Sequence, residues 1–176
     1  MSNSVTSAAS LFTLNTPDGP FTVIARQDDV VLASGWTDQV SELTGQIHRD
    51  LLPEAILESA PLASIEDAVA AFYAGDLTAI DSVEVLQQSG PFRSHAWRVL
   101  REVPAGRPVT YSEYADLAGN PRAVRAAASA CAFNAAALFV PCHRVLRLDG
   151  SLGGFRWGLK IKRSLLDRES ALPTHE

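Results

Sequence analysis

The feature that most constrains the fold of this chain is a change of character close to residue 90. Before that point, short runs rich in β-branched residues alternate with turn signals, and after it apolar residues recur at helical spacing. The polar segment Gln-Gln-Ser-Gly-Pro at 87–91 separates the two regions. With 176 residues, we expect an α/β chain of two modules, a supporting module at 1–88 and a second at 91–170, followed by a tail at 171–176.

The first module is predicted to be a small antiparallel sheet with helices. The turn-forming sequence Thr16-Pro-Asp-Gly-Pro20 lies between two strand-like runs, and Ile65, Val69 and Phe72 share one face at helical spacing. Strands are expected at 11–14, 21–25, 30–33 and 79–86, and helices at 38–52 and 62–74.

The second module is predicted to be mainly helical. Apolar residues within 92–103 fall at helical spacing, and an alanine-rich segment at 122–133 has high helix propensity. Between them, Thr110 or Ser112 can cap a short helix that ends before Gly119. A helix, a glycine-containing turn and a second helix form the helix-turn-helix pattern, which is typical of DNA-binding modules.

The charges of the two modules have opposite signs. The net charge is −5, but thirteen acidic residues against two arginines give residues 1–90 a charge of −11. Residues 91–176 carry eleven arginines and two lysines against seven acids, a charge of +6. An arginine-rich module favours a polyanionic partner, since one guanidinium group can donate two hydrogen bonds at once to phosphate or base oxygens. The alternative is that two solvated surfaces merely differ in charge.

Composition excludes several classes of protein. The two cysteines, Cys131 and Cys142, are too few for a disulfide scaffold, and their spacing from the four histidines is not that of a zinc site. No apolar run approaches the ~20 residues of a membrane helix, and residues 1–7 lack the pattern of a signal peptide. We expect a cytoplasmic protein with no membrane contact.

The segment with the most chemical content is 136–145, where an apolar run leads to Cys142, His143 and Arg144. A buried cysteine is most often a small packing residue. Here the two following side chains can favour the thiolate, which is the reactive form. A nucleophile with a base also needs a third group that orients the base, and Glu169 is the candidate.

The second module carries short motifs in a fixed order. They are Thr110-Tyr111, Pro121-Arg-Ala-Val-Arg-Ala126, Asn134, Pro141-Cys-His-Arg-Val145, Gly153-Gly-Phe-Arg-Trp-Gly158 and Leu165-Leu-Asp-Arg-Glu169. On these residues, 91–170 resembles the O(6)-alkylguanine-DNA alkyltransferases, also called methylated-DNA–protein-cysteine methyltransferases, of the bacterial Ada and Ogt type. The first ninety residues match that family only weakly.

The resemblance implies a ribonuclease H-like first module and specific roles in the second. His143, polarised by Glu169, would take the thiol proton through a water, and Arg125 would fill the place of a flipped base. Implied catalytic residues are Cys142, His143, Glu169, Asn134 and Tyr111. Implied DNA contacts are Thr110, Arg122, Ala123, Arg125, Ala126, Ala127 and Ser129. Implied pocket residues are Cys131, Val145, Phe155, Arg156 and Trp157.

The implied reaction is direct repair of O(6)-alkylguanine, and of O(4)-alkylthymine, in double-stranded DNA after nucleotide flipping. In-line displacement would leave a thioether on Cys142, so each molecule would act once, with no cofactor and no metal. The resemblance implies a monomer that can assemble cooperatively on DNA. The bulk of Trp157 departs from some family members and predicts a narrowed pocket.

Two other functions remain open from the sequence. A DNA-binding protein that flags flipped lesions without transfer would share the helix-turn-helix, but relatives of that kind lack the reactive cysteine. A thiol hydrolase built on Cys142, His143 and Glu169 would need an oxyanion hole and turnover, and it leaves Tyr111 and Arg125 without a role.

Overall fold

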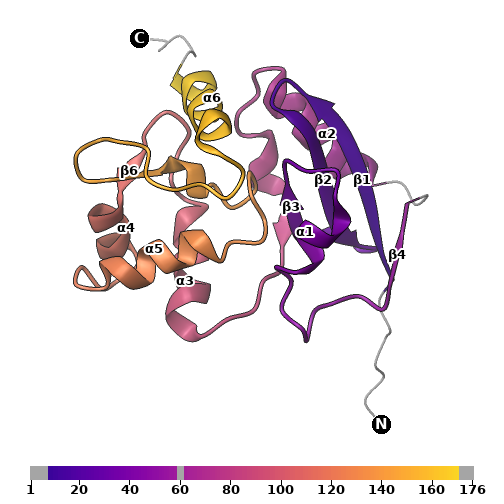
Figure 1. Cartoon of the computed structure of the whole chain (residues 1–176), viewed down its shortest axis with the longest axis horizontal. Helices are drawn as coiled ribbons and strands as arrows, with labels where there is room; N and C mark the ends of the chain where they lie inside the picture. Colours follow the sequence, from indigo (N-terminus) through magenta and orange to yellow (C-terminus); the bar gives the residue numbers. More distant parts are fainter. Residues whose placement is uncertain (1–7, 59–61, 171–176) are drawn as a thin grey trace.

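In the computed structural model, which describes residues 8–58 and 62–170, the N-terminal half forms a five-stranded sheet (Figure 1). The Asp18-Gly19 turn joins the first two strands, and the Thr16 hydroxyl both accepts from the Asp18 N–H at 3.1 Å and donates to the Gly19 carbonyl at 2.7 Å. The strands are β1 (Ala8–Thr16), β2 (Gly19–Arg26), β3 (Val30–Gly35), β4 (Ala55–Leu57) and β5 (Glu84–Val85).

The prediction of a purely antiparallel sheet is wrong, because the sheet is mixed. The strand order is β4-β1-β2-β3-β5, in which β4 runs parallel to β1 and β5 runs parallel to β3. Both edge strands arrive after long connections, which parallel pairing requires, whereas the central three strands are joined by tight turns. Edge strands of two and three residues carry no alternation that a sequence pattern could show.

Helices cover both faces of this sheet. In β2, Phe21, Val23 and Ala25 face α2 (Ala63–Tyr73) and the C-terminal half, while Ile24 faces α1 (Val40–Thr44). Burial on two faces explains why β2 and β3 are almost continuously apolar. The short 3-10 helix η1 (Ala79–Ser82) leads into β5, where one strand over 79–86 was predicted.

The predicted helix over 38–52 is much shorter in the structure. Helix α1 ends at Thr44, and turns continue the chain. The same apolar cluster contains Leu43, Ile47 and Leu51, which are four residues apart from one to the next. A short helix followed by turns therefore places on one side the residues that a continuous helix would also place there. The predicted helix is therefore confirmed only over Val40–Thr44.

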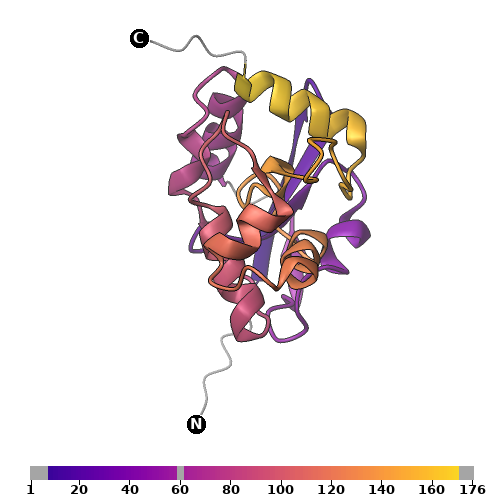
Figure 2. The ribbon, with the colours of Figure 1, turned by 90° about the vertical axis from the view of Figure 1, so that its left-hand side faces the viewer.

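The C-terminal half is mainly helical, as predicted. Figure 2 shows α4 and α5 in front of the sheet, with α6 across the top of the molecule. The elements are α3 (Pro91–Leu100), β6 (Val109–Thr110), α4 (Tyr111–Leu117), α5 (Val124–Ala132), η2 (Cys142–Arg144), β7 (Val145–Leu146) and α6 (Leu159–Ser170). Strands β6 and β7 pair in parallel.

The helix-turn-helix is formed by α4 and α5. Thr110 caps α4 in a capping box, accepting from the Glu113 N–H at 3.1 Å while the Glu113 carboxylate accepts from the Thr110 N–H at 3.2 Å. Gly119 ends this helix at a φ of 94°, a conformation that favours glycine. Helix α5 begins at Val124, two residues later than predicted, because the turn at Pro121 and Arg122 comes first.

Thr110→Ala is expected to lower the free energy of unfolding by about 1 kcal/mol, because the cap at the start of α4 is lost. Ser112→Ala is the matched control, since Ser112 is exposed and makes no side-chain cap. Urea unfolding of both variants measures the difference. Equal effects would mean that the capping box contributes nothing to stability.

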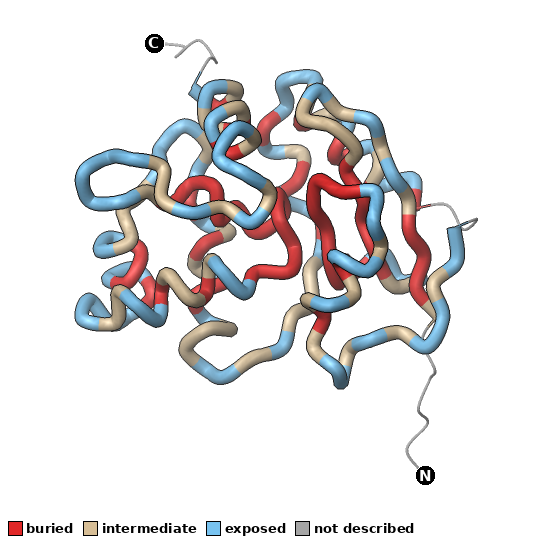
Figure 3. Tube along the Cα trace, in the orientation of Figure 1, coloured by how far each residue is buried: buried red, intermediate tan, exposed pale blue. Residues whose placement is uncertain are grey.

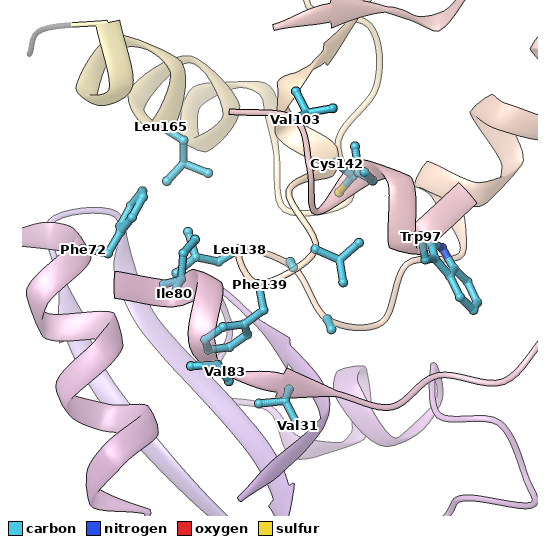
Figure 4. Close-up of a cluster of buried hydrophobic side chains, with 14 of the residues drawn as sticks. Val31, Phe72, Ile80, Val83, Trp97, Val103, Leu138, Phe139, Cys142 and Leu165 are labelled. Carbon is cyan, nitrogen blue, oxygen red and sulfur yellow. The ribbon is translucent and has the colours of Figure 1, made fainter. Parts of the chain in front are cut away.

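The sheet and the helical half share one hydrophobic core. Phe21 of β2 and Phe139 lie 6.2 Å apart between ring centroids, and the same cluster contains Trp97 and Cys142 (Figure 4). Figure 3 shows buried segments on both sides of the junction between the two halves. No helix in the described residues is long and apolar enough to span a membrane.

Candidate active site

Cys142 begins the 3-10 turn η2 at the end of a buried segment, and only 8% of its surface is exposed. The Asn134 side chain fixes the preceding backbone: its Nδ2 donates to the Val140 carbonyl at 2.8 Å, and its Oδ1 accepts from the Ala136 N–H at 3.0 Å. The Cys142 N–H donates to the same Val140 carbonyl at 2.8 Å. Asn134 therefore holds the turn that presents the thiol.

His143 and Glu169, 26 residues apart in sequence, meet in the interior. The Nε2 atom of His143 lies 2.6 Å from Oε1 of Glu169, and both side chains are buried. The same carboxylate accepts from Nε and Nη2 of Arg144 at 2.9 to 3.1 Å, and Nη1 of Arg144 donates to the Val103 carbonyl at 2.7 Å. Arg144, which the sequence placed beside the thiol, thus pairs with Glu169 instead.

Burial decides the protonation state of His143. It lowers the pKa of His143 against the opposing effect of Glu169, so the ring is neutral near pH 7. A neutral ring that donates from Nε2 to a carboxylate leaves the lone pair on Nδ1. Nδ1 is buried and has no hydrogen-bond partner within the described residues. It is the basic atom of this pair.

Burial also raises the pKa of the Cys142 thiol. Asn134, Lys162 and Arg156 favour the thiolate, but burial outweighs them. Cys142 is therefore a thiol near neutral pH, and a reaction at its sulfur needs a nearby base.

A cavity of about 440 Å³ opens beside Cys142. Four sequence-predicted pocket residues line it: Cys131, Phe155, Arg156 and Trp157. Tyr111 and Asn134 also line it, so with Cys142 three of the five implied catalytic residues line the cavity, whereas His143 and Glu169 do not. The exception among the pocket residues is Val145, which is fully buried and does not line the cavity. A thiol in a cavity of this size can act on a group of several atoms.

Comparison with known proteins decides the family. Residues 91–171 match the family model described as "6-O-methylguanine DNA methyltransferase, DNA binding domain". Over 160 residues, the chain is 32% identical to the "Methylated-DNA--protein-cysteine methyltransferase" of Salmonella typhimurium, covering 89% of this chain and 93% of that relative. This chain belongs to the methylated-DNA–protein-cysteine methyltransferase family.

Other family members are similar over different lengths. The "Bifunctional transcriptional activator/DNA repair enzyme Ada" of Escherichia coli is 51% identical over 79 residues, which are 45% of this chain but only 22% of Ada. The match to the regulatory protein Ada of Salmonella typhimurium likewise covers 24% of that protein. The crystal structure of Mycobacterium tuberculosis OGT in complex with DNA superposes with a TM-score of 0.76 at 31% identity, covering 92% of this chain and 93% of OGT.

The structure adds Lys162 to the site of this methyltransferase family member. Its side chain is fully buried in α6, and Nζ donates to the carbonyls of Val145 at 2.8 Å and Gly154 at 3.2 Å. It thus ties the strand after the active-site turn to the loop that lines the cavity. Lys162 lies on the same helical face as Leu165 and Glu169, three and seven positions on, a spacing that could have placed it inside.

Gln87 is a second residue that sequence reasoning missed, because it lies in the segment assigned to the break between modules. Its Nε2 donates to Oδ1 of Asn134 at 2.9 Å, and its Oε1 accepts from the Ala135 N–H at 2.8 Å. The break therefore contributes directly to the support of the active-site turn. A polar residue in a loop gives no sequence signal for such a contact.

Helix α5 divides the implied DNA-contacting residues into two groups. Arg122, Arg125 and Ala126 are exposed, and Ala123 is half-buried at the start of the helix. Ala127 is fully buried and packs against the core, so its assignment to a DNA-contacting surface is wrong. Spacing explains this, because residues 127 and 130 share the inner face.

Two further residues of the implied DNA surface have partners within the protein. The Thr110 hydroxyl is engaged in the α4 cap. The Ser129 hydroxyl accepts from Nη2 of Arg93 at 2.7 Å, and the same guanidinium lies 4.4 Å from the centre of the exposed Phe133 ring. Of the residues that the sequence assigned to DNA, Arg125 of α5 and Arg122 in the turn before it are the charged ones left exposed.

Proposed function

We propose that this protein repairs O(6)-alkylguanine, and O(4)-alkylthymine, in duplex DNA by moving the alkyl group to Cys142. The observation that carries the proposal is the buried thiol of Cys142 at the cavity, followed in the same 3-10 turn by His143, whose neutral ring is paired with Glu169. Membership of the methylated-DNA–protein-cysteine methyltransferase family supports the same reaction.

The chemical step is a single displacement. The Cys142 sulfur attacks the alkyl carbon, a new sulfur–carbon bond forms, and the bond from that carbon to O(6) of guanine breaks. The electron pair of the broken bond passes to the guanine, whose N1 takes up one proton in exchange for the one that the thiol gives up, so that the normal base is restored. Nδ1 of His143 accepts the thiol proton through a water, and Glu169 stabilises the ring that carries it.

Tyr111 is proposed to donate a hydrogen bond to the guanine ring. It lines the cavity, and burial raises the pKa of its hydroxyl to about 12. The hydroxyl therefore stays protonated near neutral pH and keeps its donor. A donor at this place stabilises the negative charge that develops on the departing base.

The product sets the stoichiometry. Alkylated Cys142 is a thioether, which has no good leaving group from which the thiol could be regenerated. Each molecule is therefore consumed by one reaction.

The exposed face of α5 is proposed to meet the DNA, with Arg125 in the place of the flipped nucleotide. The related Mycobacterium tuberculosis OGT has been crystallised in complex with DNA, which supports a DNA-binding surface in this fold. Phosphate contacts from arginines predict an affinity that falls as salt is added. The protein is proposed to be a monomer that can assemble cooperatively on its double-stranded partner.

Residues 1–88 are proposed to be a supporting domain and residues 91–170 the acting domain. The meander of β1, β2 and β3, with β4 parallel to β1, supports a reduced ribonuclease H-like sheet.

The free thiols of Cys131 and Cys142 suit the reducing cytoplasm, where we propose that the protein acts.

The test uses duplex DNA that carries guanine with a tritium-labelled methyl group. We expect the label to move to the protein and to remain there after denaturing electrophoresis. Label that stays on DNA despite selective binding would contradict the proposal and indicate a lesion-flagging protein. Label released as a small molecule with turnover would also contradict it and indicate a hydrolase.

Arg125→Ala is expected to slow repair of duplex DNA by about tenfold or more, since an inserted side chain offsets an unstacking cost of a few kcal/mol. Repair of a single strand should change far less, because no stacked neighbour has to be replaced. Arg122→Ala is the contrast variant: it should weaken duplex binding and reduce the salt dependence. Duplex repair rates unchanged by Arg125→Ala would contradict the inserted role.

A further inference from the structure

The end of strand β3 is attached directly to the segment that precedes Cys142. Ser34 is fully buried, its N–H donates to the Ala135 carbonyl at 2.9 Å, and its Oγ donates to the Ala137 carbonyl at 2.8 Å. These two bonds cross from the N-terminal sheet to the C-terminal half. They fix the position of the next residue, Gly35, relative to the active-site cavity.

Gly35 lies against the indole ring of Trp157. A Cβ atom built on Gly35 would lie 2.7 Å from Cη2 of that ring and closer still to Cζ2 and Cε2. The backbone of Gly35 lies outside the left-handed region, so an L-residue fits its conformation. The three atoms nearest to that Cβ all belong to Trp157, so the indole ring is what glycine makes room for at this position.

Trp157 is part of the wall of the 440 Å³ cavity. The residue after Gly35 supports a second aromatic wall: the Trp36 ring lies 5.9 Å from the Phe155 ring between centroids. Trp36 is itself held by a hydrogen bond from its Nε1 to the Tyr73 hydroxyl at 2.9 Å. The last two residues of β3, Ser34 and Gly35, and the next residue, Trp36, therefore support the cavity from outside.

We propose that Gly35 is a specificity-determining residue: by leaving room for the Trp157 ring, the N-terminal sheet sets the width of the alkyl cavity. This inference rests on the proposed function and concerns which alkyl groups the site accepts. Close packing in protein interiors transmits a displacement of one ring to its neighbours, so a side chain at position 35 must move the cavity wall. Gly35 acts through Trp157 and is a positioning residue.

The experiment compares transfer rates from duplex DNA carrying O(6)-methylguanine and O(6)-benzylguanine. Gly35→Ala is expected to change the ratio of benzyl to methyl rates by about tenfold or more, the scale on which pocket shape discriminates between substrates. In a protein that already carries Trp157→Ala, the Cβ added by Gly35→Ala meets no indole ring. There, Gly35→Ala should leave the ratio of benzyl to methyl rates unchanged. Gly90→Ala is the matched control, since a Cβ there meets nothing within 4 Å.

Each result decides between the two proposals. An unchanged ratio in Gly35→Ala, or a change that persists in the Trp157→Ala background, overturns the role of Gly35. Absence of methyl transfer by the unsubstituted protein overturns the proposed function instead. If Gly35→Ala alone does not fold, the same comparison in a Trp157→Phe background gives the Cβ more room and decides the question in the same way.

Discussion

Replacing Cys142 by alanine is expected to abolish alkyl transfer while the affinity for duplex DNA stays within about twofold, because phosphate contacts supply most of that affinity. The substitution removes only the sulfur from a side chain that is 8% exposed at the cavity. Exposed Arg125 of α5 and Arg122 in the preceding turn, which we propose to contact the DNA, are left in place. Transfer is followed with the labelled duplex, and binding by fluorescence anisotropy.

Cys131→Ala is the matched control, since Cys131 lines the same cavity. Burial raises the pKa of Cys131 as well, and the charge of Lys162 only partly opposes it. Cys131 lies in helix α5 and not in the 3-10 turn that carries Cys142 and His143, so Cys131→Ala should still accept the methyl group. Transfer that persists in Cys142→Ala and disappears in Cys131→Ala would move the acceptor to Cys131.

Glu169→Gln is expected to lower the free energy of unfolding by about 3–5 kcal/mol, the cost of breaking a buried ion pair. The amide keeps the shape of the side chain but leaves the buried Arg144 guanidinium without an opposite charge. It also replaces the charged acceptor of His143 Nε2 by a neutral amide oxygen, which stabilises a protonated His143 ring less, so transfer by the folded fraction should slow. Urea unfolding and single-turnover rates measure the two effects.

Asp167→Asn is the control for this substitution, because Asp167 is an exposed carboxylate in the same helix. Its effect on stability should lie within about 0.5 kcal/mol, as for most surface changes. Similar losses in the two variants would show that the pair of Glu169 with Arg144 contributes no more to stability than a surface charge.

The same carboxylate predicts an acid dependence of stability. Burial raises the pKa of Glu169, but the charges and hydrogen bonds of His143 and Arg144 outweigh burial and lower it from the ordinary 4.5 to about 2. Near neutral pH, the positive charge that faces the Glu169 carboxylate is that of Arg144, because His143 is uncharged. Since the folded-state pKa is the lower one, this stabilisation is complete above pH 4.5 and is lost as the pH falls toward 2. It is worth on the order of 3 kcal/mol.

Local sequence patterns predicted the elements that local forces determine. The Asp18-Gly19 turn, the buried stripe of α2 and the capped helix α4 followed by Gly119 all come from residues close in sequence. The edge strands β4 and β5 pair with strands far away in the chain, and nothing within their few residues shows that partner. Prediction of a mixed sheet would have required knowledge of those long-range pairs.

The candidate site was predictable to the extent that its chemistry is unusual in sequence. A cysteine followed by histidine, with a glutamate on a later helix, identified the buried group that the structure brings together at 2.6 Å between His143 and Glu169. Gln87 and Lys162 were missed, because hydrogen bonds to backbone groups, and in Gln87 also to the Asn134 side chain, leave no pattern in the sequence. Ala127 was misassigned because alanine fits an exposed helix face and a buried one equally well.

The central claim is that Cys142 is an alkyl acceptor used once, and intact mass spectrometry tests it most directly. The protein is mixed with excess duplex DNA containing O(6)-methylguanine, and its mass is followed until it stops changing. We predict the replacement of one hydrogen by one methyl group in every molecule, located at Cys142 by peptide mapping, with repair ending at one equivalent. Repair that continues past one equivalent, or a methyl group on any other residue, would contradict the claim.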